Sequence, residues 1–337
     1  MSRILSVFKQ ILRVLFFVSI GGFLLYLALK NIDLSKLWYD LLSARYEYVI
    51  ISMILGYLAF ISRGIRWNYL LEPMGYRVPV WKSIHSISIG YLANAAMPRA
   101  GEVIRCTALH QATKVPINRL VGTVVAERVV DMLMLILSLL LSLIFNVGKI
   151  VAFYNQTFKT DASPKDASLS PKWFVFGSIL LLGIIVFAFK NKLKALPMMS
   201  KIRELWAGFR EGIFSVMNTP KRIPFILHTL FIWFCYYLMV HIVVFALPAT
   251  AHLSLSDSLF IMIVAGLGML VPAPAGIGSY HYAVVTGMGI LGIAADTGMA
   301  FATLVHTGQF IMTLVAGFVS LIGMYVWKSK KSVVADF

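Results

Sequence analysis

The sequence has few of the residues that metal and redox chemistry require. Among its 337 residues there are only two cysteines, Cys106 and Cys235, and they form no Cys-x-x-Cys pair. They therefore indicate neither a disulfide framework nor a zinc site. The seven histidines are scattered and never recur at a His-x-x-x-His spacing. We predict no metal centre and no cofactor.

Charged residues are scarce as well. They make up 13% of the chain, against 59% hydrophobic residues, and the mean hydropathy is +0.83. This composition excludes an ordinary soluble domain, and several apolar runs approach the roughly 20 residues that a helix needs to span a bilayer. Acidic residues are rarer than basic ones, 14 against 30. The sequence predicts an all-α integral membrane protein with no nucleic-acid partner and no separate hydrophilic catalytic domain.

Nine apolar runs divide the chain. They lie at about 14–29, 46–62, 83–97, 120–147, 173–189, 224–247, 258–271, 280–294 and 299–327. The first follows Arg3, Lys9 and Arg13 like a signal peptide, but it lacks a small-residue cleavage site, so we interpret it as a retained helix. The nine runs indicate a single polytopic domain over 1–337, with a first half of about 1–170 and a second of about 171–337.

The distribution of Lys and Arg predicts the orientation of this domain. Basic residues concentrate at both termini and in three segments between runs, 63–82, 99–119 and 190–222, whereas 248–257 and 295–298 contain none. By the positive-inside rule the basic segments are cytoplasmic, and so are both termini. An amphipathic stretch at about 198–217 is expected to lie in the cytoplasmic interface.

The run 83–97 is expected not to cross, because basic segments precede and follow it. It is short, rich in polar residues and ends at Met97-Pro98-Arg99-Ala100-Gly101. A second Pro/Gly break, Val271 to Gly278, follows the run 258–271 from the uncharged side. Two interrupted segments in comparable positions of two halves are typical of inverted-repeat transporters with the site between them. The alternative is a pair of ordinary kinked helices.

Three ionisable residues are predicted to lie near the middle of the membrane. Arg128 is the one Lys or Arg inside an apolar run, and it stands between Glu127 and Asp131. Glu127 follows Arg119 by eight residues and Asp131 follows it by twelve, so at about 1.5 Å per residue they lie roughly 12 and 18 Å further along a helix. Such residues predict a substrate, ion or proton pathway. The alternative is a structural ion-pair cluster in which Arg128 contacts Asp131, and we expect loss of Arg128 to be more damaging than neutralising either acid.

Further arginines are candidates for holding phosphate. Arg63 and Arg66 share one helix face at the cytoplasmic end of the second run, beside Trp67. A planar guanidinium matches phosphate oxygens bidentately, although an anchor at the interface is the alternative. Arg99 and Arg105, which flank Glu102, are expected either to bind phosphate, to pair with the two acids of the long run, or to form a plain basic loop. For His281 and His306 the alternative to a protonatable site is simple packing.

Four short motifs follow one another along nearly the whole chain. They are Arg63-x-x-Arg66-Trp67, Asn94-x-x-x-Pro98-Arg99-x-Gly101-Glu102-x-x-Arg105, Glu127-Arg128-x-x-Asp131 and Pro272-x-Pro274-x-Gly276-x-Gly278. In this order and at these separations they resemble the lysylphosphatidylglycerol synthase transmembrane-region family. That family includes the membrane half of the bacterial multiple peptide resistance factor, which moves aminoacylated phosphatidylglycerol across the cytoplasmic membrane. The resemblance implies a flippase-like fold of about eight spanning helices plus re-entrant helices, in a bacterial inner membrane.

Two departures from the family pattern bear on function. The soluble aminoacyl-transfer domain of the resistance factor is missing before the chain stops at Phe337, so we do not expect lysyl transfer. In the second break Ala275 replaces a glycine of the usual Pro-Gly-Gly, and His281 stands where an acid is common. The identity of the substrate is therefore left open.

Together these observations predict a lipid flippase that binds a phospholipid or polyprenyl-phosphate lipid at its cytoplasmic side and translocates the headgroup. The substrate-binding candidates are Arg63, Arg66, Asn94, Arg99, Glu102 and Arg105. The translocation-path candidates are Glu127, Arg128, Asp131, Pro272, Pro274, Gly276, Gly278 and His281. The alternatives are an integral-membrane enzyme of lipid metabolism, for which no catalytic constellation is found, and an accessory protein of such an enzyme. A homo-oligomer or a lipid-synthesis partner is possible.

Overall fold

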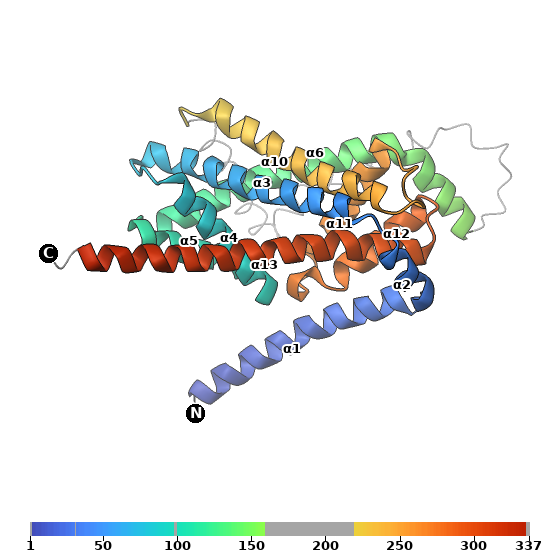
Figure 1. Cartoon of the computed structure of the whole chain (residues 1–337), viewed down its shortest axis with the longest axis horizontal. Helices are drawn as coiled ribbons and strands as arrows, with labels where there is room; N and C mark the ends of the chain where they lie inside the picture. The colour runs from blue at the N-terminus through green and yellow to red at the C-terminus, as the bar shows by residue number, and fades with distance from the viewer. Residues whose placement is uncertain (1, 31, 98–99, 159–218, 335–337) are drawn as a thin grey trace, which may run out of the picture.

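The computed structural model describes residues 2–30, 32–97, 100–158 and 219–334, and every regular element in them is helical (Figure 1). These residues form ten α-helices and three short 3-10 helices, which confirms the all-α prediction. The expected span at 173–189 and the expected interfacial helix at 198–217 lie outside the described residues.

Four helices are long and apolar enough to cross a membrane. They are α3 (Tyr46–Leu71), α6 (Ile117–Phe158), α10 (Arg222–Val243) and α13 (Ala295–Val334). A fifth crossing is possible if α1 (Ser2–Leu29) and α2 (Leu34–Leu42), which meet at a bend of 93°, form one broken span. The chain is thus a multi-pass membrane protein, but its described residues supply four or five spans where the sequence predicted about eight.

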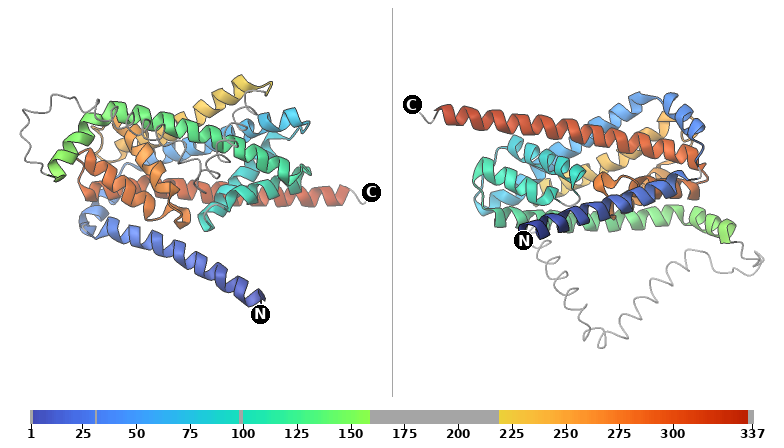
Figure 2. Two further views of the ribbon diagram at one scale, coloured as in Figure 1. Left: turned by 180° about the vertical axis from the view of Figure 1, so that it is seen from behind. Right: turned by 90° about the horizontal axis from the view of Figure 1, so that it is seen from below.

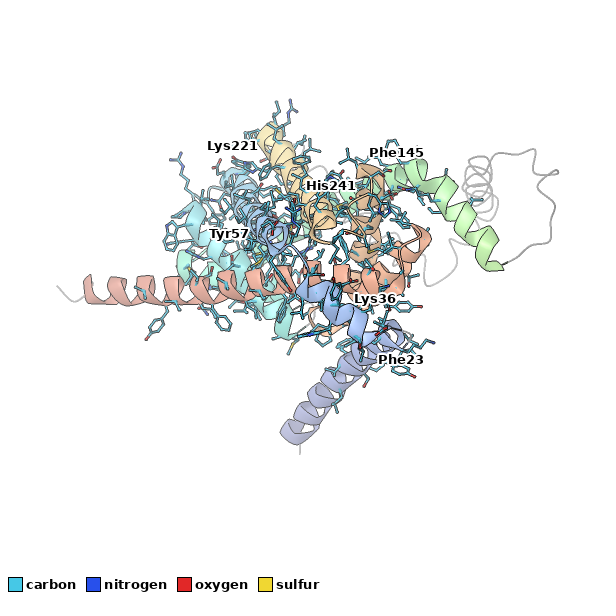
Figure 3. The ribbon with its side chains drawn as sticks, turned by 45° about the vertical axis from the view of Figure 1, so that its right-hand side comes forward. Phe23, Lys36, Tyr57, Phe145, Lys221 and His241 are labelled. Atoms are coloured by element: carbon cyan, nitrogen blue, oxygen red, sulfur yellow. The ribbon has the colours of Figure 1, made fainter. Side chains whose placement is uncertain are left out.

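The outer surface of the bundle is apolar, as contact with lipid requires. Phe23 on α1, Tyr57 on α3 and Phe145 on α6 are exposed, and their positions can be followed in Figure 3. Lys36 on α2 and Lys221 at the start of α10 lie at opposite ends of the bundle. A long apolar helix surface flanked by charged ends is the pattern of a membrane span.

The polar run at 83–97 forms one arm of a helical hairpin. It lies in α4 (Val80–Ala96), which is followed by the break and by α5 (Gly101–Thr113). The two helices touch at Gly90 and Gly101, where a Cβ atom on Gly101 would collide with the carbonyl oxygen of Gly90. The amide oxygen of Asn94 accepts a hydrogen bond of 2.7 Å from the Gly101 N–H. These contacts fold α5 back along α4, which agrees with a run that turns back instead of crossing.

The second break forms a hairpin of the same kind. It joins α11 (Leu255–Leu270), the short 3-10 helix η3 (Pro274–Gly276) and α12 (Ser279–Ile290). Gly268 lies against Ser279 and Ala283, and Gly287 lies against Val264. The runs 258–271 and 280–294 therefore pack against each other as a short antiparallel pair around the predicted break. Helix α11 has 16 residues and α12 has 12, fewer than the roughly 20 that a spanning helix needs.

The N-terminus of α11 is fixed by a capping box. Ser254 and Asp257 exchange side-chain and backbone hydrogen bonds, which satisfies backbone N–H groups of the first turn. Asp257 is also paired with Lys149 of α6. This ion pair ties the long helix α6 to the base of the second hairpin.

The two hairpins enter the bundle from opposite ends. In Figure 1 the pair α4 and α5 lies toward the end where both chain termini are found, whereas α11 and α12 lie at the other end, and the reverse view in Figure 2 agrees. Helices α3 and α10 pack along one another, with η1 (Glu72–Met74) and η2 (Val244–Ala246) at their ends. Helix α13 runs past both hairpins. This arrangement brings the two tips together in the middle of the molecule.

Candidate functional site

A cavity of about 750 Å³ lies between the tips of the two hairpins. Asn94 and Glu102 line it from the first hairpin, and Pro272 and Gly276 line it from the second. Helix α4 also contacts η3 directly. The prediction that the two breaks meet in space is confirmed for the described residues, whereas Pro98 and Arg99 lie outside them.

One wall of the cavity is backed by a buried ion network. Arg63 of α3 pairs with Asp131 of α6 at 2.8 Å, and Arg66 contacts both Asp131 at 3.0 Å and Glu127 at 3.4 Å. Arg105 of α5 pairs with Glu127 at 2.9 Å. Arg66 and Glu127 are fully buried. The cation that separates the two acids is therefore Arg66, which comes from another helix.

The alternative in which Arg128 pairs with Asp131 is wrong. Arg128 instead contacts Glu102 of α5 at 2.9 Å, and its side chain is 47% exposed. Both residues of this pair border the cavity. The reason is helix geometry, because a step of one residue turns Arg128 about 100° around α6 from Glu127, and there it contacts the first hairpin.

The network holds its arginines in several further contacts. Arg63 Nε donates to the Tyr236 hydroxyl at 2.9 Å, and Arg66 Nη1 donates to Thr229 Oγ1 at 3.0 Å. The Arg105 guanidinium lies 4.9 Å from the centre of the Trp67 ring. These side chains are buried, so the interpretation of Arg63 and Arg66 as anchors at the membrane interface is excluded. Tyr236 and Thr229 were not found from the sequence, since nothing in their local pattern marks them.

The charges of this network do not balance. Three guanidiniums, of Arg63, Arg66 and Arg105, face two carboxylates, of Glu127 and Asp131. The neighbouring pair of Arg128 and Glu102 adds no net charge. Arg63 Nη1 is buried without a hydrogen-bond partner among the described residues. Arg63 and Asp131 line the cavity, so the network that borders it holds one more cation than anion among the described residues.

The second break shapes the opposite wall with strained backbone. Ala275 has φ of 52° and Gly276 has φ of 76°, in the left-handed region that disfavours residues with a Cβ. The Ala275 carbonyl, turned out by this conformation, accepts a hydrogen bond of 2.9 Å from His306 Nε2 of α13. Pro274 and Gly278 face α1 at Gly21, where a Cβ on Gly278 would collide with the Gly21 carbonyl oxygen.

Two histidines and a tyrosine lie beside this break. His281 of α12 and His306 of α13 have ring centroids 4.9 Å apart, and the Tyr280 ring is also 4.9 Å from His306. His306 and Tyr280 line the cavity, and His281 is buried next to them. His281 is therefore adjacent to the predicted path instead of in its lining.

The remaining lining is aromatic and polar. Phe60 and Tyr91 stack with ring centroids 4.2 Å apart. Gln309 and Thr313 follow His306 along one face of α13. The described part of the cavity thus combines an arginine-bearing wall, a neutral polar face and large apolar surface, which suits a molecule with a charged headgroup and hydrocarbon chains.

The structure sorts the predicted site residues into three groups. Those that line the cavity are Arg63, Asn94, Glu102, Arg128, Asp131, Pro272 and Gly276. Those buried in or beside its walls are Arg66, Arg105, Glu127 and His281. Pro274 and Gly278 face α1, and Arg99 lies outside the described residues.

Comparison with known proteins agrees with this architecture. A segment of 114 residues is 30% identical to the UPF0104 membrane protein MJ1595 of Methanocaldococcus jannaschii, which amounts to 33% of this chain and 34% of that protein. The chain thus matches about a third of that relative's length. The model of the lysylphosphatidylglycerol synthase TM region matches residues 10–317. The chain belongs to the lysylphosphatidylglycerol synthase transmembrane-region family.

Proposed function

We propose that this protein binds a phosphate-bearing membrane lipid in the central cavity and moves its headgroup from one leaflet to the other. The observation that carries the proposal is the excess positive charge in the cavity wall. Three buried arginines face two buried acids there. An uncompensated charge in a low-dielectric interior is costly, and a phosphate that enters the cavity would remove that cost.

The two hairpins supply a reason to propose transport in preference to catalysis. Their tips meet at the cavity, and they enter from opposite ends of the bundle. In inverted-repeat transporters, movement of one repeat against the other opens such a site to each side in turn. The ion pair of Arg128 with Glu102 links α6 to the first hairpin, so rupture of this pair would accompany opening on that side.

We also propose that the end bearing both termini faces the cytoplasm. Arg77, Lys114, Arg119 and Lys221 lie in loops or helix starts at that end of the bundle. An excess of Lys and Arg marks the cytoplasmic side of a membrane protein. The lipid would then enter past the half-exposed Arg128, from the cytoplasmic leaflet.

The test uses two variants that break the same ion pair in opposite ways. Arg128→Ala removes a cation from the cavity, whereas Glu102→Gln breaks the pair and keeps that cation. The measurement is headgroup translocation of fluorescent phosphatidylglycerol in proteoliposomes, with Arg119→Ala as a control at an exposed basic residue outside the cavity.

We expect Arg128→Ala to slow translocation about tenfold or more, since a hydrogen bond to a charged group contributes roughly 1.5 to 3 kcal/mol. Glu102→Gln and Arg119→Ala should retain activity. Equal loss in Arg128→Ala and Glu102→Gln would mean that the ion pair itself matters and not the positive charge of Arg128. Absence of translocation by the wild-type protein with any phosphate-bearing lipid would refute the function.

A further inference from the structure

The histidine pair beside the second break is not used by the proposed function. His281 and His306 come from different helices, α12 and α13, and their rings are 4.9 Å apart at an interplanar angle of 64°. At this spacing a small rotation of either ring brings two imidazole nitrogens within hydrogen-bonding distance. The pair lies at the cavity, because His306 forms part of its lining.

The hydrogen bond to the break fixes the tautomer of His306. A carbonyl oxygen can only accept, so His306 Nε2 carries the hydrogen that it donates to Ala275 at 2.9 Å. The other ring nitrogen, Nδ1, then has a free lone pair when the ring is neutral. A backbone carbonyl held in place by the left-handed conformation of Ala275 keeps this orientation.

His281 provides the second half of the site. His281 is only 7% exposed, and its Nδ1 atom has no hydrogen-bond partner among the described residues. A buried polar atom without a hydrogen-bond partner destabilises the folded protein. A proton added to the neutral pair gives one imidazolium with an N–H on both ring nitrogens, and its additional N–H can donate to the lone pair of the other ring. A second proton would be opposed by like charge.

We propose that His281 and His306 form a proton-binding site that takes up one proton from water when an anionic headgroup enters the cavity. This inference rests on the proposed function, since the headgroup supplies the counter-charge. Transport of the lipid would then carry a proton with it.

The carboxylates around α12 explain why the counter-charge must come from a ligand. On the described parts of the elements that pack against it, Asp257 is paired with Lys149, and Asp296 with Lys36. On α6, Asp131 forms ion pairs with Arg63 and Arg66, and Glu127 forms ion pairs with Arg66 and Arg105.

Among the described side chains of α12 and α1, the other ionisable ones are phenols. They are Tyr280 and Tyr282 on α12 and Tyr26 on α1. A proton on the histidine pair therefore meets no carboxylate outside an ion pair on the described parts of α6, α11, α12 and α13. A phosphate in the cavity would stabilise it, and by thermodynamic reciprocity the proton would stabilise the bound phosphate.

The test is the pH dependence of binding by the detergent-purified full chain. The probe is short-chain phosphatidylglycerol, with zwitterionic short-chain phosphatidylcholine as the matched ligand. Calorimetry in two buffers of different ionisation enthalpy counts the protons taken up. Between about pH 8 and about pH 5, where imidazoles ordinarily titrate, affinity for the anionic probe should rise by up to about tenfold per pH unit as pH falls.

The variants keep the local hydrogen bonds and remove the titration. His306→Gln retains a donor to the Ala275 carbonyl, and His281→Asn places an amide near the position of Nδ1. The double variant should bind the anionic probe with no proton uptake and little pH dependence. His241→Asn on α10, whose ring contacts Ser258 and does not line the cavity, should behave like the wild type. If the double variant does not fold, the single variant His281→Asn should likewise show no proton uptake and little pH dependence of binding.

The proton site would be overturned if the affinity of the wild type for the anionic probe did not change with pH, or if the pH dependence of affinity survived in the double variant. In the first case the proposed function still stands, provided that the anionic probe binds. Failure of the probe to bind at any pH would overturn both.

Discussion

At the scale of single residues, burial decides which charge in the network matters most for stability. Glu127 is fully buried between Arg66 and Arg105. In Glu127→Gln two buried guanidiniums would lose their shared partner, and we expect destabilisation by roughly 3 to 5 kcal/mol. Arg128→Ala breaks a half-exposed pair, and its cost should be no more than about 1 kcal/mol. Thermal unfolding in detergent measures both, and an equal or larger loss in Arg128→Ala would contradict this ranking.

This ranking reverses the one that the sequence suggested. The sequence predicted that Glu127 and Asp131 are buried, and the structure confirms that both lie inside the bundle, whereas their depth in a membrane stays a prediction. Like charges four residues apart on one helix require a cation between them. The sequence could not identify that cation, because Arg66 is 61 residues from Glu127 along the chain. Arg128, adjacent in sequence, was chosen for its proximity alone. Long-range pairing depends on how α3, α5 and α6 pack, which a local pattern does not contain.

At the scale of elements, each hairpin depends on glycines where its two helices meet. A Cβ atom on Gly268 of α11 would come within 2.7 Å of Ala283 Cβ and 2.8 Å of the Ser279 carbonyl oxygen. Gly268→Ala should therefore force α12 away and destabilise by about 1 to 3 kcal/mol. Gly289→Ala on α12, where nothing lies within 4 Å, is the matched control and should not destabilise. Thermal unfolding and translocation are the measurements, and similar behaviour of the two variants would rule out the close-packing role.

The hairpins also show how far sequence reasoning about elements reaches. Proline and glycine located both breaks, and flanking basic residues indicated that 83–97 turns back. The arms of the second hairpin, 258–271 and 280–294, are apolar throughout, and hydropathy alone does not distinguish a short re-entrant arm from a span. Glycine pairs such as Gly90 with Gly101 acquire meaning only once the partner helix is known.

At the scale of the whole molecule, the hairpin model makes a topological prediction. Arg77 and Gln111 are exposed near the start of α4 and the end of α5, so cysteines placed there should be labelled from the same side. Ala251, exposed in the turn before α11, should be labelled from the opposite side. The native Cys106 and Cys235 are buried and should remain unlabelled. Labelling of the Arg77→Cys and Gln111→Cys variants from opposite faces would mean that α4 and α5 together cross the membrane.

The charge of the whole cavity predicts which headgroups the molecule prefers. The acids that line it are Glu102 and Asp131, and both are paired with arginines. An aminoacylated headgroup carries ammonium groups that would find no unpaired carboxylate among the described lining residues. A headgroup of net negative charge instead compensates the excess cation. We therefore expect short-chain phosphatidylglycerol to bind at least about tenfold more tightly than its lysyl ester, since one poorly solvated like-charge contact costs on the order of 1 to 2 kcal/mol.

A single substitution can test this preference in both directions. Gln309 lines the neutral face of α13, and Gln309→Glu places a carboxylate there at nearly constant volume. The variant should lose affinity for phosphatidylglycerol and gain affinity for the lysyl ester, whereas Thr313→Ser, on the same face but uncharged, should change neither. Native mass spectrometry with both lipids in competition gives the ratio directly. Tighter binding of the lysyl ester by the wild-type protein would show that groups other than the described cavity wall select the substrate, because the charge that the wall presents favours the opposite order.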